Sequence, residues 1–191
     1  MKKIIWIGIA LLLVFVSVSS FNGLVSMDEK VSSQWGNVET AYQRRADLIP
    51  NLVSTVKGYA DFEKETLMGV IEARSKATQT QINVDDLSPE NIQKFQAAQS
   101  KLSGSLSRLL VTVERYPDLK ASQNFLELQS QLEGTENRIA VERNKFNKAV
   151  EPYNAKVRKF PTVIFANMFD FTAKGYFNAT EGADVVPTVT F

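Results

Sequence analysis

The sequence contains neither cysteine nor histidine. Without thiolate and imidazole ligands, the common zinc, iron–sulfur and haem sites are excluded, as are cysteine nucleophiles, histidine bases and disulfide bonds. Lys and Arg number 22 and Asp and Glu 21, so the chain lacks the excess positive charge that binds nucleic acid. Phosphate-binding glycine loops and nucleophile elbows are also missing. We therefore expect no enzyme activity and no cofactor or metal.

The chain begins with a long uncharged segment. Residues 4–21 carry no charge and directly follow two lysines. At 1.5 Å per residue a helix of this length spans roughly 27 Å, close to the ~30 Å hydrocarbon thickness of a bilayer. A cleaved secretory signal is the alternative, with a weak cleavage site after Ser19. We favour a retained anchor because the apolar pattern continues well beyond Val16 without a polar break.

The charges on either side of this segment predict its orientation. Two lysines and the α-amino group precede it, whereas Asp28, Glu29 and Lys30 follow it. The positive-inside rule then places the N-terminus in the cytoplasm and the remaining chain outside, as in a single-pass cell-membrane protein. We expect an anchor over 1–21 that contacts lipid through 4–21. The residues beyond it are enough for one domain with its own core.

Beyond the anchor, apolar residues recur every 3.5 residues on average. The pattern runs from Phe21 to Tyr59, interrupted by polar Asp28 and Arg45, and predicts one continuous helix with an apolar seam. Pro50 lies inside it. We expect a kink there and not an end, because the phase of the pattern survives. The same helix is predicted to continue, with a shift of phase, to about residue 80.

Two further long helices follow. One is predicted to begin at Pro89, after an N-cap serine, and to end near Pro117. The other, from Phe125 to Phe160, has the most regular apolar repeat and contains Pro152. Three long helices with short connections fold most simply as an up-and-down bundle. The predicted fold is all-α: an N-terminal transmembrane helix continues into an elongated up-and-down bundle of three long helices plus a short C-terminal helical segment.

The C-terminal part is rich in large apolar side chains. Residues 160–177 are too apolar for a solvated tail. Their simplest interpretation is a short fourth helix that closes the bundle, so that the domain covers 22–178. A docking surface for another subunit, a partner or the membrane is the alternative. Residues 179–191 are β-prone and predict an extended or disordered tail, which could add to a neighbour as a strand.

Four separated groups of residues carry a resemblance to a known family. They are FNGLV at 21–25, QRRADLIPNLV at 43–53, ENRIA at 136–140, and the pairs FN, YN and FP at 146–147, 153–154 and 160–161. In this order they resemble the signature segments of the LemA family, and the likeness covers nearly the whole chain. The resemblance implies a bacterial membrane protein with one N-terminal span and a helical bundle domain. It implies no catalytic residues.

Polar residues of these segments fall on the predicted seams. Arg45 lies on the seam of the first helix, where an unpaired charge is unfavourable, and Glu142 lies on that of the third, with Glu136 nearby. We expect a network between these helices that fixes their register. The alternative is a pocket opened at Pro50, where Arg44 or Arg45 binds an anionic group. The candidate network comprises Arg44, Arg45, Asp47, Asn51, Glu136, Asn137, Arg138 and Glu142. Four asparagines are expected to bind carbonyls freed by the prolines: Asn51, Asn137, Asn147 and Asn154.

Three classes of function stay open. The first is a non-enzymatic structural or scaffolding protein of the bacterial cell envelope. It would form a homo-oligomer, because the second helix is too short to cover the seam between Leu24 and Tyr42. The second is an adaptor that presents or regulates a membrane partner, such as a protease or stress component, through the C-terminal aromatic segment. The third is a hydrolase that uses carboxylate pairs. The expected partner surface comprises Trp35, Tyr42, Phe165, Phe169, Phe171, Tyr176 and Phe177.

Overall fold

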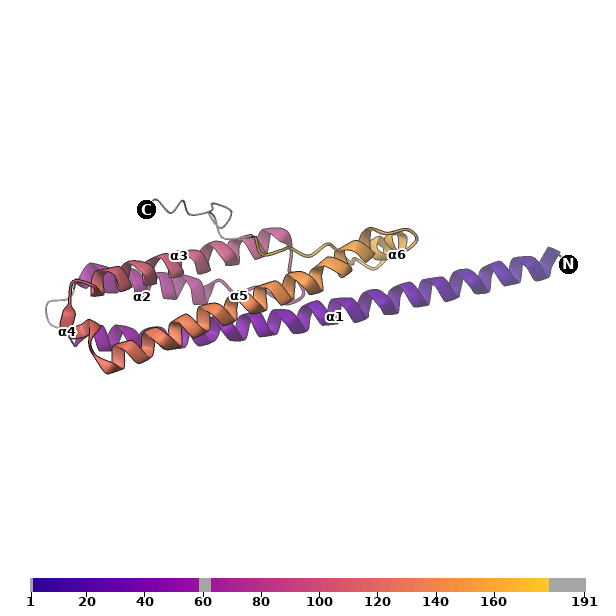
Figure 1. Ribbon diagram of the computed structural model, residues 1–191. Helices are drawn as coiled ribbons and strands as arrows, with labels where there is room; N and C mark the ends of the chain where they lie inside the picture. Colours follow the sequence, from indigo (N-terminus) through magenta and orange to yellow (C-terminus); the bar gives the residue numbers. More distant parts are fainter. Residues whose placement is uncertain (1, 59–62, 179–191) are drawn as a thin grey trace, which may run out of the picture.

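The protein is an elongated bundle of antiparallel helices at the end of one very long helix (Figure 1). Its structure is a computed structural model that describes residues 2–58 and 63–178. Over these ranges the chain forms helices and no strand, which confirms the predicted all-α fold. The helices are α1 (Lys2–Lys57), α2 (Lys64–Gln79), α3 (Pro89–Val113), α4 (Pro117–Lys120), α5 (Gln123–Arg158) and α6 (Thr162–Met168).

Helix α1 continues without interruption from the apolar N-terminal segment into the bundle. It has 56 residues and passes through Pro50, so the proline does not end the helix, as predicted. Proline cannot donate to the carbonyl four residues back, which here belongs to Ala46. That carbonyl accepts a hydrogen bond of 2.7 Å from Nε of Arg74 in α2. An arginine from the neighbouring helix, and not an asparagine, therefore satisfies the freed carbonyl.

The prediction that the first helix continues to about residue 80 is wrong. Helix α1 ends at Lys57, and α2 forms a separate helix that packs back against it. The shift of phase beyond Tyr59 marks this change of helix: Leu67 and Val70 of α2 pack into the same distal cluster as Leu52 and Val56 of α1. The bundle therefore contains four long helices, with the first predicted helix divided in two.

The apolar core consists of two clusters along the bundle axis. The membrane-proximal cluster includes Trp35 and Phe146, and the distal cluster includes Leu52 and Leu109. Helix α2 contributes no residue to the proximal cluster, whereas α3 extends further along the bundle (Figure 1) and contributes Ile92 and Phe95. The proximal cluster is completed by apolar residues of the linker between α2 and α3 and by Phe177 of the C-terminal segment.

The C-terminal part is only partly helical. The short helix expected within 160–177 is confined to α6, which ends at Met168. Asp170, two residues later, has the left-handed conformation (φ 57°). The Phe171 amide donates to the Ala166 carbonyl, 3.0 Å away, in the pattern of a Schellman motif. Residues 171–178 then run back along the bundle as an extended strap. The predicted tail at 179–191 lies outside the described residues.

The N-terminal half of α1 stands apart from the bundle (Figure 1). It contains a candidate membrane span by length and composition, and the most apolar window of that span is wholly exposed. Large apolar side chains such as Trp6 and Phe15 are about 70% exposed. A water-soluble bundle would bury such residues, so the exposure fits a segment surrounded by lipid.

Candidate functional site

A buried arginine lies at the centre of the bundle. Arg45 is 1% exposed, and its Nη1 donates to Glu136 Oε1 and to Ser103 Oγ, both at 2.7 Å. Its Nη2 donates to Oε1 of Gln99 at 2.6 Å and to the carbonyl of Gln99 at 3.3 Å. The guanidinium also lies over the Tyr42 ring, 5.1 Å from its centroid. Arg45 therefore joins α1 to both α3 and α5, and Glu136 is its ion-pair partner.

These residues form a polar layer between the two apolar clusters. In α1, Arg45 falls between Tyr42 of the proximal cluster and Ile49 of the distal one. Gln99 of α3 and Thr135 of α5 are also buried and occupy the corresponding gaps in their helices. The amide of Gln99 donates to the Ala77 carbonyl at 3.2 Å, which brings α2 into the layer. Four helices are thus hydrogen-bonded or packed at one level.

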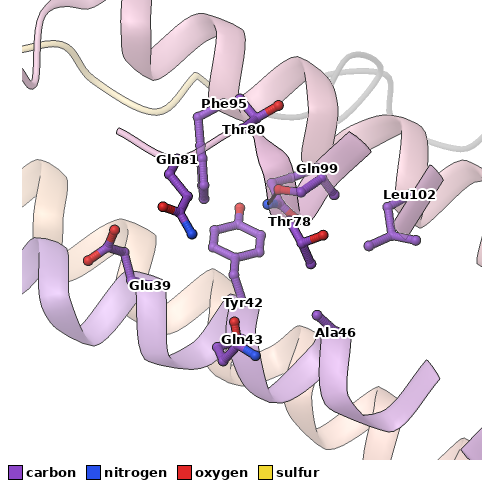
Figure 2. A pocket seen from close by; sticks show the side chains of 11 residues that line it. Glu39, Tyr42, Gln43, Ala46, Thr78, Thr80, Gln81, Phe95, Gln99 and Leu102 are labelled. Carbon is purple, nitrogen blue, oxygen red and sulfur yellow. Dashed lines mark hydrogen bonds between the residues drawn. The ribbon is translucent and has the colours of Figure 1, made fainter. Parts of the chain in front are cut away.

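A small cavity of about 100 Å³ adjoins this layer. Figure 2 shows the Tyr42 ring extending into it, with Gln81 and Gln99 on either side. Burial raises the pKa of Tyr42, and the cations Arg143 and Arg45 oppose the increase. Small-molecule sites usually occupy at least about 300 Å³. The cavity suits water better than a substrate.

Glu142 does not contact Arg45. It is 1% exposed, and its Oε1 lies 2.8 Å from Arg138 Nε in an ion pair and accepts a hydrogen bond from Lys145 Nζ at 3.1 Å, both on its own helix. Its Oε2 has no hydrogen-bond partner within the described part of the chain. Of the two expected partners of Arg45, the structure therefore brings only Glu136 to it.

The other predicted network residues lie on the surface. Asp47 accepts a bond from the Gln43 amide at 2.8 Å, and Asn51 and Asn137 are exposed. Arg44 lines a groove of about 520 Å³ between α1 and α5 together with Arg138. The anion pocket considered from the sequence would use Arg44 there and not Arg45, because the buried guanidinium of Arg45 is already hydrogen-bonded within the bundle.

Amide side chains fasten the strap to the bundle in a way that sequence reasoning missed. Asn154 accepts from the Lys174 amide at 2.8 Å and donates to the Lys174 carbonyl at 2.9 Å. Asn147 pairs identically with Phe177, at 2.9 and 2.8 Å, and Gln96 pairs with residue 178. Each amide thus replaces the neighbouring strand that an extended backbone would otherwise need. The prediction that Asn147 and Asn154 bind proline-freed carbonyls is wrong.

A second charged contact near the anchor was also missed. Lys174 is 8% exposed, and its Nζ lies 3.0 Å from Oδ1 of Asp28, an ion pair without hydrogen-bond geometry. The Tyr153 hydroxyl beside them donates to the Thr172 carbonyl at 3.0 Å. Burial, and secondarily Asp28, raises the pKa of Tyr153 well above its usual range. Asp28 is therefore part of the packing of the strap and not ordinary surface charge.

The predicted partner surface is divided by the fold. Trp35 and Tyr42 are buried, as is Phe177, whose ring stacks on Trp35 at 6.1 Å between centroids. The expectation that the seam around Trp35 is left for another copy is wrong, because α5 and the strap cover it. Phe165 and Phe171 are half-buried. Phe169 and Tyr176 are exposed and remain accessible to a partner.

Chemically, the arrangement consists of a neutralised arginine surrounded by amides and hydroxyls. Among the residues that the structure describes, no three of Asp, Glu, His or Cys are grouped so as to hold a metal. Ser103 accepts a hydrogen bond from Arg45. Its hydroxyl therefore lies next to a cation and not next to the general base that a serine nucleophile requires. The geometry suits a device that holds helices in register.

Comparison with known proteins agrees with this description. The model of the LemA family matches residues 34–191, which cover most of the bundle and the strap. The chain belongs to the LemA family. Protein LemA of Metamycoplasma hominis is 28% identical over 87% of this chain and 73% of its own length. The magnetosome protein MamQ of Magnetospirillum gryphiswaldense is 26% identical over 89% of this chain and 68% of its own. MamQ 2 of Paramagnetospirillum magneticum is 25% identical with the same shares.

Family membership bears on the functional classes. The family match and these relatives favour a membrane-associated protein of the LemA family. The buried arginine layer lies entirely within the matched region, whereas the apolar N-terminal part of α1 precedes it. The hydrolase alternative has no supporting constellation in the described residues.

Proposed function

We propose that this LemA-family protein is a membrane-anchored, non-enzymatic structural or scaffolding component of the bacterial cell envelope. The observation that carries the proposal is the continuity of α1, which runs from the candidate span into the bundle without a linker. A continuous helix is stiff, so the bundle cannot swing freely relative to the membrane. The bundle is a fixed arm, and with a cytoplasmic N-terminus it stands on the outer side.

The dimensions support a spacer or a scaffold. From residue 21 to the end of α1, a helix rises roughly 55 Å at 1.5 Å per residue. Helix α5 returns along most of this length and makes the most extensive helix contact with α1. The described part of the arm has an interior filled by apolar side chains in two clusters, and the cavity beside Tyr42 has a volume of only about 100 Å³. Such a body is better suited to act as a spacer or scaffold than to bind a substrate.

We also propose self-association, through the spans and not through the bundle seam. The chain itself covers the seam at Trp35, so this seam is not open to a second copy. The span is exposed, and a Cβ on Gly8 would meet nothing within 4 Å. Small residues such as Gly8 and Ser17 allow two spans to approach, although they lack the spacing of a strong dimer motif.

Single cysteines test this arrangement, because the chain has none of its own. Asn22→Cys lies at the membrane end and Ser107→Cys on distal α3, and both positions are exposed. After oxidation, efficient disulfide crosslinking is expected at position 22 and not at 107. Before oxidation, both thiols should be labelled by an impermeant reagent in intact cells. A monomeric mass in mild detergent would disprove self-association, and labelling only after lysis would reverse the topology.

The adaptor function is the second candidate, supported by the exposure of Phe169 and Tyr176 at 49% and 40%. Exposed aromatic side chains on one segment are typical of partner sites. Native purification of wild type and of a Phe169→Ala/Tyr176→Ala variant separates the two functions. One stoichiometric protein lost with the variant supports the adaptor. A homo-oligomer unchanged by the variant supports the scaffold.

A further inference from the structure

Helix α6 shows its apolar residues to the outside. Phe160, just before α6, and Ile164 and Met168 within it are 81%, 51% and 66% exposed. Ile164 and Met168 are spaced by four residues, which places them along one face of the helix. Thr162 and Ala166, on the opposite face, are buried against the protein. A helix on the surface of a soluble domain has the reverse pattern, with its apolar face inward.

The position of this apolar face coincides with the outer end of the candidate span. Phe21, the last residue of the uncharged N-terminal run, packs edge to face on Phe169 at 4.9 Å and on Phe171 at 5.8 Å between ring centroids. Figure 1 shows α6 at the end of the bundle that faces the N-terminal half of α1. If α1 crosses a bilayer, α6 lies at its surface.

Positive charge flanks the same face. Lys156, Arg158 and Lys159 lie at the end of α5, directly before α6. A Cβ on Gly23 would lie 2.0 Å from Lys156 Nζ, which shows that this end of α5 reaches the start of the arm. In the described ranges none of the three cations forms an ion pair. From Lys156 to residue 178 the sequence contains one acidic residue, Asp170.

We propose that α6 and the cations before it form a second membrane contact, which binds the surface of the leaflet that the anchor crosses. The apolar face enters the boundary between headgroups and acyl chains, and the cations bind the phosphates of anionic phospholipids. Apolar residues beside lysine and arginine are typical of interfacial segments. The proposal rests on the proposed anchoring by α1. With a second contact the arm is held upright at two points.

Full-length protein reconstituted in vesicles provides the test. Single cysteines at Ile164, at Val111 and at Val14 carry an environment-sensitive fluorophore, and some vesicles contain phospholipids with brominated acyl chains as quenchers. Val111 is a matched control, because it is 71% exposed on distal α3. Val14 reports on the span. Quenching is expected at positions 14 and 164 and not at 111, and circular dichroism confirms that each labelled variant is folded.

The charge contribution is tested by lipid composition. Quenching at position 164 is expected to be stronger in vesicles with 30% phosphatidylglycerol, a composition we choose for the assay, than in pure phosphatidylcholine vesicles. An Arg158→Gln/Lys159→Gln variant should abolish this difference, because each cation near an anionic surface contributes roughly a fivefold factor to binding. Lys101→Gln on exposed distal α3 is the control and should preserve the difference.

The outcomes separate the two proposals. If position 14 is quenched and 164 behaves like 111, the second contact is disproved while the anchor stands. If position 14 is not quenched, the anchor fails and the second contact with it. A fluorophore at 164 that is shielded from water but not quenched by the acyl chains indicates a protein partner on α6 and overturns the lipid assignment. Equal quenching in both lipid compositions contradicts the role of the cations.

Discussion

At the scale of single residues, the polar layer is asymmetric. Arg45 is almost fully buried, whereas the side chain of Glu136 is 43% exposed. If the ion pair is lost, the carboxylate of Glu136 can therefore be solvated by water, whereas the guanidinium of Arg45 cannot. Burial of a charge without its partner is far more costly than loss of a half-exposed one. This difference makes the roles of the two residues experimentally separable.

Removal of the carboxylate should therefore destabilise the fold more than removal of the guanidinium. Glu136→Ala leaves a buried cation and is expected to lower the free energy of unfolding by about 3 kcal/mol. Arg45→Met nearly preserves the volume of the side chain and leaves mainly Oε1 of Gln99 without a hydrogen-bond donor. The expected loss in the free energy of unfolding is about 1 to 2 kcal/mol. The double variant should be no less stable than Arg45→Met alone. Denaturant titration in mild detergent measures these values, and a larger loss for Arg45→Met would contradict the assignment.

Tyr153 should make the fold sensitive to alkali. Its pKa is raised by burial first and by Asp28 second, so above about pH 10 the unfolded chain ionises before the folded one. The unfolded state then binds fewer protons, and the free energy of unfolding falls as pH rises, by up to about 1.4 kcal/mol per pH unit. Tyr153→Phe should flatten this decline between pH 9.5 and 11. A smaller decline should remain in the Tyr153→Phe variant, because burial also raises the pKa of Tyr42. A decline identical in wild type and variant would exclude Tyr153 as its source.

At the scale of elements, the strap is held by specific geometry and not by its own secondary structure. Three amide side chains pair with its backbone, and the Gly175 amide donates to the Leu87 carbonyl at 2.8 Å. The close approach at that point requires glycine: a Cβ on residue 175 would lie 2.7 Å from Cα of Pro89 and 3.0 Å from Ile92. The strap thus depends on one residue without a side chain.

Gly175→Ala should loosen the strap without unfolding the bundle. The clash is with backbone, which cannot move aside cheaply, and overpacking of this kind costs about 1 to 3 kcal/mol. Limited chymotrypsin digestion should cleave at Tyr176 and Phe177 faster than in the wild type. Gly104→Ala, in α3 with open space around it, is the control and should add up to about 1 kcal/mol of stability. Unchanged cleavage in Gly175→Ala would show that the strap tolerates a side chain there.

At the scale of the whole molecule, stiffness follows from the unbroken course of α1. The span and the bundle share one helix, and residues 16, 17, 20 and 21 are partly covered whereas 11–15 are exposed. These covered positions lie on one helical face, against which α6 packs. The packed body therefore begins inside the apolar N-terminal run and not after it. A signal peptidase that removed this run would cut into a packed helix.

The anchor should accordingly be retained in the mature protein. Mass spectrometry of intact protein extracted from membranes is expected to show a chain that includes residues 4–21. The physical reason is that cleavage after Ser19 would cut the helix one residue before Phe21, whose ring packs on Phe169 and Phe171. A mature N-terminus at Ser20 would refute the anchor and leave a secreted bundle.

The sequence by itself determined the features that depend on local periodicity. The all-α fold, the start of α3 at Pro89, the extent of α5 and the passage of α1 through Pro50 all follow from apolar spacing and proline chemistry within one segment. The burial of Arg45 was predictable in the same way, because it interrupts an apolar seam. Its ion pair with Glu136 was one of two options, and the register of α5 against α1 chose between them.

Only the tertiary structure decided which distant segments meet. The division between α1 and α2, the coverage of Trp35 by the strap, and the contact of Lys174 with Asp28 join residues far apart in the chain. An extended strap has no period, and the amides that hold it look like ordinary polar residues of a helix. Such contacts arise because an apolar surface left open by one helix is covered by whichever segment reaches it, and the packing of the whole chain decides which segment that is.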